Sequence, residues 1–226
     1  MNAIFALPGK NCAMAVEIEL KLTLPVRAIP RLRQYAPLRE IPSRRQWVGN
    51  SYLDTPDMAL WKERIGVRRR QIKRGADTDE PWLLTVKSQG IVTDGISRRS
   101  EWEFPMPPDR LDFSGVEDAA MREWLTRLAP QLRPVFCVNF VRQSWHLSGR
   151  EVGLAASQAE LALDFGYIRA GVEKAGREAF CEVELELLEG DEALLARWGE
   201  RLCLELPELR PQAMSKAGRG YALLLR

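Results

Sequence analysis

The chain has 226 residues, with 33 Lys and Arg against 31 Asp and Glu, and a formal net charge of +2. This length and an apolar content of 46% suffice for a folded domain with its own core, which argues against general disorder. The near-zero charge argues against a basic surface for broad nucleic-acid binding.

The N-terminal segment, residues 1–15, has a short apolar stretch with no basic region before it. This pattern predicts a flexible extension rather than a signal peptide. Residues 16–226 show no linker-like composition and are predicted to form a single domain. Since no run of eighteen apolar residues occurs, no membrane partner is expected.

Alternation of apolar and polar residues with period two recurs along this domain. It predicts eight strands, at residues 16–24, 45–53, 66–72, 82–89, 97–105, 135–147, 158–169 and 178–189. Helical spacing and capping residues predict helices at residues 26–40, 57–65, 114–129 and 191–206. Residues 75–81 and 90–95 are predicted hairpin loops. Together these indicate an α+β fold, mainly β, in which an eight-stranded antiparallel sheet closes into a barrel flanked by helices.

Charged residues occupy every second position of several predicted strands. One face of the first strand carries Glu17, Glu19 and Lys21, and one face of the eighth carries Glu182, Glu184 and Glu186. A solvated charged face would explain any single strand. Aligned glutamates repel one another, however, so their clustering favours a bound cation. If these faces line the lumen of the barrel, carboxylates converge there beside Lys and Arg from other strands.

The residue types indicate a reaction class. Carboxylates without His or Cys partners favour hard divalent ions, Mg²⁺ or Mn²⁺, while Lys and Arg match phosphate oxygens. This combination predicts phosphoryl transfer, in which positioning and charge neutralisation do most of the catalysis. The single His146 has no nucleophile motif to serve. The four cysteines are far apart, which predicts free thiols in a cytoplasmic protein rather than a zinc site.

Several motifs resemble one known family. Val16-Glu17-Ile18-Glu19-Leu20-Lys21 matches the ExExK signature of the CYTH domains, the triphosphate tunnel metalloenzymes. Further elements follow in the family's order over about residues 16–225, at residues 52–57, 67–70, 84–87, 99–101, 160–166, 181–186 and 215–221. The resemblance is closest to the bacterial inorganic triphosphatases, through LALDFG, CEVELELLEGD and SKAGRGY. It implies an eight-stranded tunnel with a charged lumen, divalent-metal dependence and triphosphate-bearing substrates.

The resemblance also implies roles for individual residues. The implied metal ligands are Glu17, Glu19, Asp164, Glu182, Glu184 and Glu186. The implied substrate-binding residues are Lys21, Arg68, Arg70, Lys87, Arg99, Arg142, Lys216 and Arg219. The candidates for the catalytic general base are Glu160, Glu182 and Glu184. Arg142 could instead be a surface charge, and Arg219 could hold the C-terminal segment. Glu101 and Glu103 are either ligands or counterions, and the counterion role is favoured for Glu103.

The expected activity is hydrolysis of inorganic triphosphate to pyrophosphate and phosphate with Mg²⁺ or Mn²⁺, two ions serving during turnover. The alternatives are a nucleoside or thiamine triphosphatase, a class IV-type adenylyl cyclase, and a noncatalytic polyphosphate-binding module. A base pocket would need aromatic groups at a tunnel mouth. Trp47, Tyr52, Trp61 and Trp82 could supply them, although the barrel exterior is the expected place for these side chains.

Overall fold

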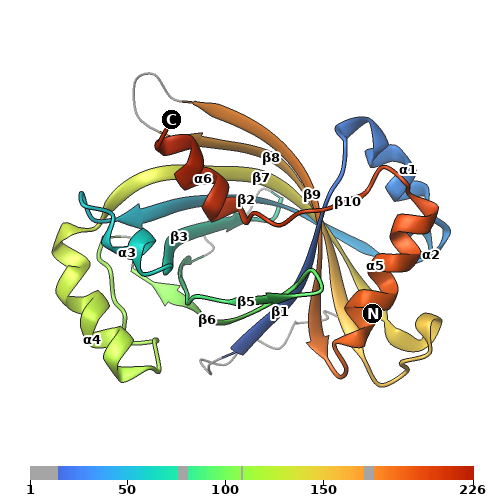
Figure 1. Cartoon of the computed structure of the whole chain (residues 1–226), viewed down its shortest axis with the longest axis horizontal. Coiled ribbons are helices and arrows are strands. Elements are labelled where there is room, and N and C mark those ends of the chain that lie inside the picture. The colour runs from blue at the N-terminus through green and yellow to red at the C-terminus, as the bar shows by residue number, and fades with distance from the viewer. Residues whose placement is uncertain (1–14, 76–80, 108, 171–175) are drawn as a thin grey trace.

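The computed structural model describes residues 15–75, 81–107, 109–170 and 176–226. Its main strands are β1 (Ala15–Thr23), β2 (Ser43–Asp54), β3 (Gly66–Lys73), β4 (Trp82–Lys87), β6 (Ile96–Met106), β7 (Arg133–Ser148), β8 (Gln158–Ala170) and β9 (Arg177–Glu189). They pair antiparallel in the order β1-β9-β8-β7-β2-β3-β4-β6, and the β1–β6 pairing closes the ring (Figure 1). The predicted eight-stranded barrel is therefore confirmed. The predicted extension, residues 1–15, lies outside the described residues except for Ala15, which begins β1.

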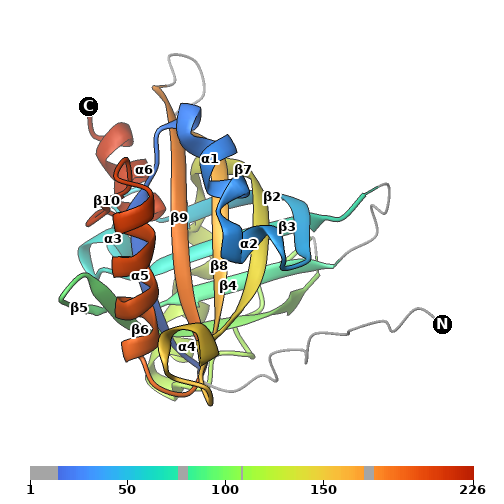
Figure 2. The ribbon, with the colours of Figure 1, turned by 90° about the vertical axis from the view of Figure 1, so that its right-hand side faces the viewer.

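Helices cover the outer, apolar faces of the strands. On one side α1 (Ile29–Gln34), α2 (Ala36–Arg39) and α5 (Ala193–Glu205) pack over β1, β7, β8 and β9, as Figure 2 shows. On the other side α4 (Ala119–Leu128) covers β2, β3, β4 and β6. Because the apolar face of each strand is buried under these helices, the alternating charged face points into the lumen.

A third apolar cluster lies inside the barrel at one end. The lumen faces of β2, β7, β8 and β9 pack there against α6 (Lys216–Leu224), which crosses β7 and β8 in Figure 1. Val138 and Ile168 are fully buried in this cluster, and Tyr221 of α6 is 2% exposed. The lumen is therefore apolar where α6 fills it and charged over the rest of its length.

The prediction of one continuous helix at residues 26–40 is wrong. The segment is divided into the 3₁₀ turn η1 (Val26–Ala28), α1 and α2, and Tyr35 between the last two has an extended ψ of 122°. Pro37 explains the break, because it lacks an N–H and its ring would clash with the carbonyl of the preceding turn. The predicted helix at residues 57–65 shortens to α3 (Ala59–Lys62), since Met58 before it has a left-handed φ of 59°. The third helix begins at Ala119, where Asp118 caps it, and not at residue 114.

Several short elements escaped prediction. They are β5 (Ile91–Thr93), β10 (Arg210–Pro211), η2 (Ala129–Gln131), η3 (Gly149–Val152) and α6. The predicted loop at 90–95 contains β5, which turns into β6 through Asp94 and Gly95, both with positive φ. Residues 76–80 of the other predicted loop lie outside the described residues. No described helix has the length and hydropathy needed to cross a membrane.

Candidate active site

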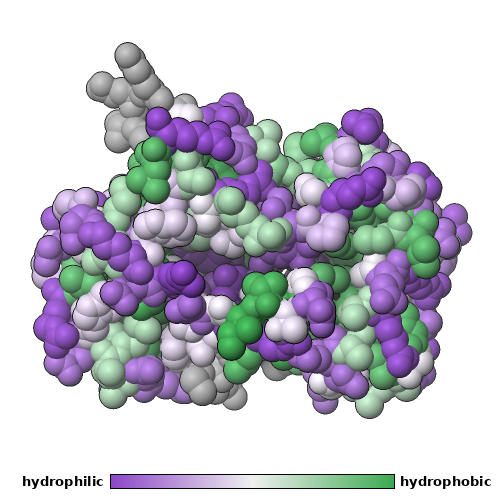
Figure 3. All heavy atoms as spheres, in the orientation of Figure 1, coloured by the Kyte–Doolittle hydropathy of each residue, from purple (hydrophilic) through white to green (hydrophobic). Residues whose placement is uncertain are grey.

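A cavity of about 780 Å³ occupies the charged part of the lumen. Figure 3 shows its mouth as a hydrophilic hollow near the centre of the molecule. The charged side chains in its wall are Glu17, Glu19, Lys21, Lys62, Arg64, Arg68, Arg70, Lys87, Arg99, Glu101, Glu103, Arg142, Glu184, Glu186 and Lys216. Both signs of charge therefore face one enclosed space.

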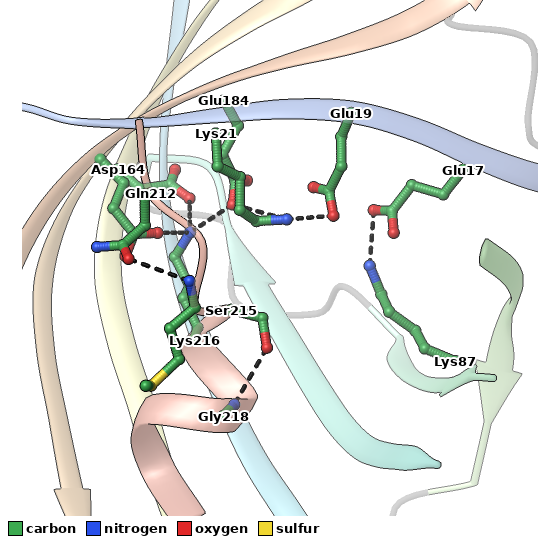
Figure 4. A network of polar contacts seen from close by, with 12 residues as sticks. Glu17, Glu19, Lys21, Lys87, Asp164, Glu184, Gln212, Ser215, Lys216 and Gly218 are labelled. Carbon is green, nitrogen blue, oxygen red and sulfur yellow. Dashed lines mark hydrogen bonds and ion pairs between the residues drawn. The ribbon is translucent and has the colours of Figure 1, made fainter. Parts of the chain in front are cut away.

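On β1, the ExExK glutamates pair with cations from β1 itself, β4 and β6. Lys87 lies 2.7 Å from Glu17, and Arg99 donates to the other oxygen of Glu17 at 2.7 Å. Arg99 donates to Glu19, and Lys21 also contacts Glu19, as Figure 4 shows. Burial by itself would raise the pKa of Glu17, but Lys87 and Arg99 hold that pKa well below its ordinary value. Glu17 is therefore a carboxylate at any physiological pH.

A second cluster joins β2, β3, β4 and β6. Arg70 donates to Glu103 at 3.1 Å and to Asn50 at 3.0 Å, and Thr85 donates to Glu103 at 2.7 Å. Arg68 lies 3.8 Å from the same carboxylate. Although burial opposes ionisation, the two arginines lower the pKa of Glu103 to about 2. Glu103 thus serves as an internal counterion.

The third cluster surrounds Lys216, the first residue of α6, which enters the lumen from the plugged end (Figure 4). Its ammonium group lies 2.8 Å from Asp164 and Glu184 and 2.9 Å from Glu182. Arg142 makes a two-pronged contact to Asp164, with both distances 2.7 Å, and also donates to Glu184 at 2.7 Å. Burial opposes ionisation of Glu184, yet Lys216 and the other nearby cations keep its pKa well below the usual range. The same carboxylates raise the pKa of Lys216 above its ordinary value against the effect of burial.

Most of the predicted site residues line the cavity, and four of them lie outside its wall. Those in the cavity wall are Glu17, Glu19, Lys21, Arg68, Arg70, Lys87, Arg99, Arg142, Glu184, Glu186 and Lys216. Asp164 and Glu182 are fully buried behind Lys216. Arg219 holds Glu178 at 2.7 Å and also contacts Glu182, so it ties α6 to β9. Glu160 lies opposite Glu186 on the neighbouring strand.

Some residues of the cavity wall were not predicted as site residues. Asn50 orients Arg70, and its place in the alternation of β2 is a signal that could have identified it. Lys62 ends α3 and Arg64 lies just after it, outside the strands, so strand alternation could not predict that they face the cavity. Of the four aromatic residues considered for a base pocket, Tyr52 and Trp61 line the cavity.

The donor chemistry of the lumen fits a hard divalent ion. Glu19, Glu186 and Glu160 lie directly opposite one another on β1, β9 and β8, at the spacing of cross-strand neighbours. All their oxygens are of the type that Mg²⁺ and Mn²⁺ prefer. The described part of the chain has no group of three or more His, Cys, Asp or Glu side chains already arranged around an ion position. Ion binding would therefore require carboxylates such as Glu19 to turn away from their Lys and Arg partners.

Comparison with known proteins places the fold. The CYTH domain family matches residues 15–221. The inorganic triphosphatase of Haemophilus influenzae is 31% identical over 215 residues, which are 93% of this chain and 55% of that protein. The chain thus spans about half the length of this curated relative.

Two solved structures share the fold. The Hippeastrum protein HpAC1, described as having a dominant triphosphatase activity, superposes with a TM-score of 0.63 at 18% identity, over 91% of this chain and 95% of its own. A proposed adenylate cyclase from Bacillus halodurans gives 0.59 at 17% identity, over 91% and 97%. At these identities the similarity concerns the fold alone.

Proposed function

The chain belongs to the CYTH domain family, and on this premise we propose that it hydrolyses inorganic triphosphate to pyrophosphate and phosphate. The observation that carries the proposal is the enclosed cavity in which Lys and Arg from five strands and α6 alternate with carboxylates. A small, highly charged polyanion fits such a wall, because Arg and Lys match phosphate oxygens from several directions. The relative from Haemophilus influenzae, named an inorganic triphosphatase, supports the same reaction.

The basic residues would bind the phosphates and spread the charge of the transferring group. Arg68, Arg70 and Lys87 lie on one wall, and the opposite wall carries Lys21, Arg142 and Lys216. Each of these cations is already paired with a carboxylate, so a bound triphosphate would replace carboxylate contacts. The released carboxylates would then need new positive partners. This exchange explains why substrate and divalent ions would bind together.

For the ions we propose Mg²⁺ or Mn²⁺, two during turnover, held by Glu17, Glu19, Glu184 and Glu186, with Asp164 and Glu182 behind them. When bound, such an ion neutralises phosphate charge and lowers the pKa of the attacking water. The water oxygen forms a bond to the terminal phosphorus, the bridging P–O bond breaks, and pyrophosphate leaves.

A carboxylate takes the proton of the water, and we favour Glu160 for this role. Glu182 is fully buried against Lys216. Glu184 is already held by Lys216 at 2.8 Å and by Arg142 at 2.7 Å, and it is one of the proposed metal ligands. Glu160 lies on β8 directly opposite Glu186, a carboxylate of the cavity wall.

A nucleoside triphosphatase is the second candidate, because Trp61 is 38% exposed in the cavity wall and could stack with a base. Release of phosphate, pyrophosphate and cyclic AMP should be measured from tripolyphosphate and from ATP, each with Mg²⁺ and Mn²⁺. We expect phosphate and pyrophosphate from tripolyphosphate. Cyclic AMP would indicate a cyclase, and binding without any turnover would indicate a noncatalytic polyphosphate-binding module.

Glu184→Ala tests the site within that assay. It should abolish metal-dependent turnover, whereas Glu123→Ala, on the exposed surface of α4, should leave it unchanged. Near-normal phosphate release by Glu184→Ala would exclude the assignment. A cytoplasmic location is also proposed, since the described cysteines, Cys137, Cys181 and Cys203, are free thiols.

A further inference from the structure

Asp54, the last residue of β2, is a fully buried carboxylate held by neutral donors. Its Oδ1 accepts from the backbone N–H of Thr55 at 2.7 Å and of Leu60 at 2.9 Å. Its Oδ2 accepts from the N–H of Trp61 at 3.1 Å and from the hydroxyl of Tyr221 at 2.8 Å. A buried charge satisfied in this way is sensitive to the loss of any single donor.

Tyr221 connects this carboxylate to α6. Its ring stacks on Trp61, with centroids 4.4 Å apart, and meets the edge of Phe136 of β7 at 5.0 Å. One turn of α6 also touches Phe136 through Gly220, where an added Cβ would lie 2.2 Å from the aromatic ring. Because only glycine allows this approach, α6 is seated closely against the inside of the barrel.

The other end of α6 carries Lys216, which contacts three carboxylates in the lumen. It lies about 7.5 Å along the helix axis from Tyr221, at 1.5 Å per residue. Ser215 caps this end, since its hydroxyl accepts from the N–H of Gly218 at 3.1 Å. A displacement of Tyr221 would therefore be transmitted along one short helix to Lys216.

We propose that Asp54 and Tyr221 are positioning residues that fix α6. They thereby hold Lys216 at the place in the lumen where the triphosphate binds. The inference rests on the proposed function, because it assigns a substrate contact to Lys216. Loss of the Tyr221 hydroxyl leaves one lone pair of Asp54 unpaired and loosens α6. Lys216 then has to be ordered when substrate binds, which raises KM and leaves kcat little changed.

Steady-state kinetics with tripolyphosphate would test this coupling in Tyr221→Phe. KM should rise about tenfold, the size expected for one hydrogen bond to a charged group, with kcat within about twofold of the wild type. Tyr167→Phe is the matched control, since its hydroxyl lies on the outer face of β8 and accepts only a long contact of 3.5 Å from Asn139. In a Lys216→Met background, Tyr221→Phe should change KM no further. An unchanged KM in the single variant, or additive effects in the double variant, would overturn the proposal.

Hydrogen exchange at the amides of residues 218–224 gives a readout that does not depend on activity. Exchange should be faster in Tyr221→Phe than in wild type or Tyr167→Phe. Should Tyr221→Phe fail to fold, Gly220→Ala displaces α6 by pressing a methyl group on Phe136, and it should raise KM and exchange in the same way. If exchange rises in a chain without triphosphatase activity, the proposed function fails and the anchoring of α6 stands. Unchanged exchange overturns the anchoring whatever the activity.

Discussion

Replacing Lys216 with Met would remove one cation from among three buried carboxylates. Lys216 is 7% exposed and lies 2.8 to 2.9 Å from Asp164, Glu182 and Glu184. Removing one partner of a buried ion pair costs about 3–5 kcal/mol, because the remaining charges stay desolvated. For a chain of this size, that corresponds to a fall in Tm of roughly 10 °C at pH 7.

The loss of stability in Lys216→Met should depend on pH in a defined direction. Lys216 is the main charge that lowers the pKa of Glu184 against the effect of burial. A lowered carboxylate pKa contributes stability that is present above the unfolded value of about 4.3 and is lost as pH falls through the folded value. Lys216→Met should therefore be strongly destabilised at pH 7, and its loss of stability should shrink as the pH falls from about 4.3 toward the lowered pKa of Glu184.

Thermal unfolding of both proteins at pH 7 and at about pH 2 checks this expectation. Lys62→Met is the control, because Lys62 is exposed at the rim and lies 3.7 Å from Asp57. Its effect should be within about 0.5 kcal/mol. A Lys216→Met variant as stable as the wild type at pH 7 would refute the reasoning. So would a loss of thermal stability, relative to the wild type, of equal size at both pH values.

Three further expectations concern the cavity and the outer core. Arg70→Ala should raise KM for tripolyphosphate about tenfold by removing a phosphate contact; steady-state kinetics with unchanged KM and kcat would contradict its role in the lumen. EDTA should abolish phosphate release, and added Mg²⁺ or Mn²⁺ should restore it, so persistent turnover in EDTA would exclude metal dependence. Leu202→Ala, in the fully buried face of α5, should lower the free energy of unfolding in urea by about 2–5 kcal/mol while KM stays unchanged. A shift in KM would mean that the outer core also sets the geometry of the lumen.

The barrel could be predicted because strand periodicity is a local property of the chain. Alternation in β1 puts Glu17 and Glu19 on one face whatever surrounds them. The break at Pro37 was also present in the sequence, although the helical spacing around it concealed the break. Short elements such as β5 escaped because three residues are too few to show a period.

Which face of each strand points inward could not be read from any one strand. It depends on the β1–β6 pairing that closes the ring and on the helices that cover the apolar faces. Closure also brings Asp54 to Tyr221 across 167 positions of sequence. The sequence by itself determined the eight strands and their two chemically opposite faces, since these follow from a two-residue repeat. Only the tertiary structure decided which carboxylate meets which cation and where Lys216 enters, because those contacts join residues that are distant along the chain.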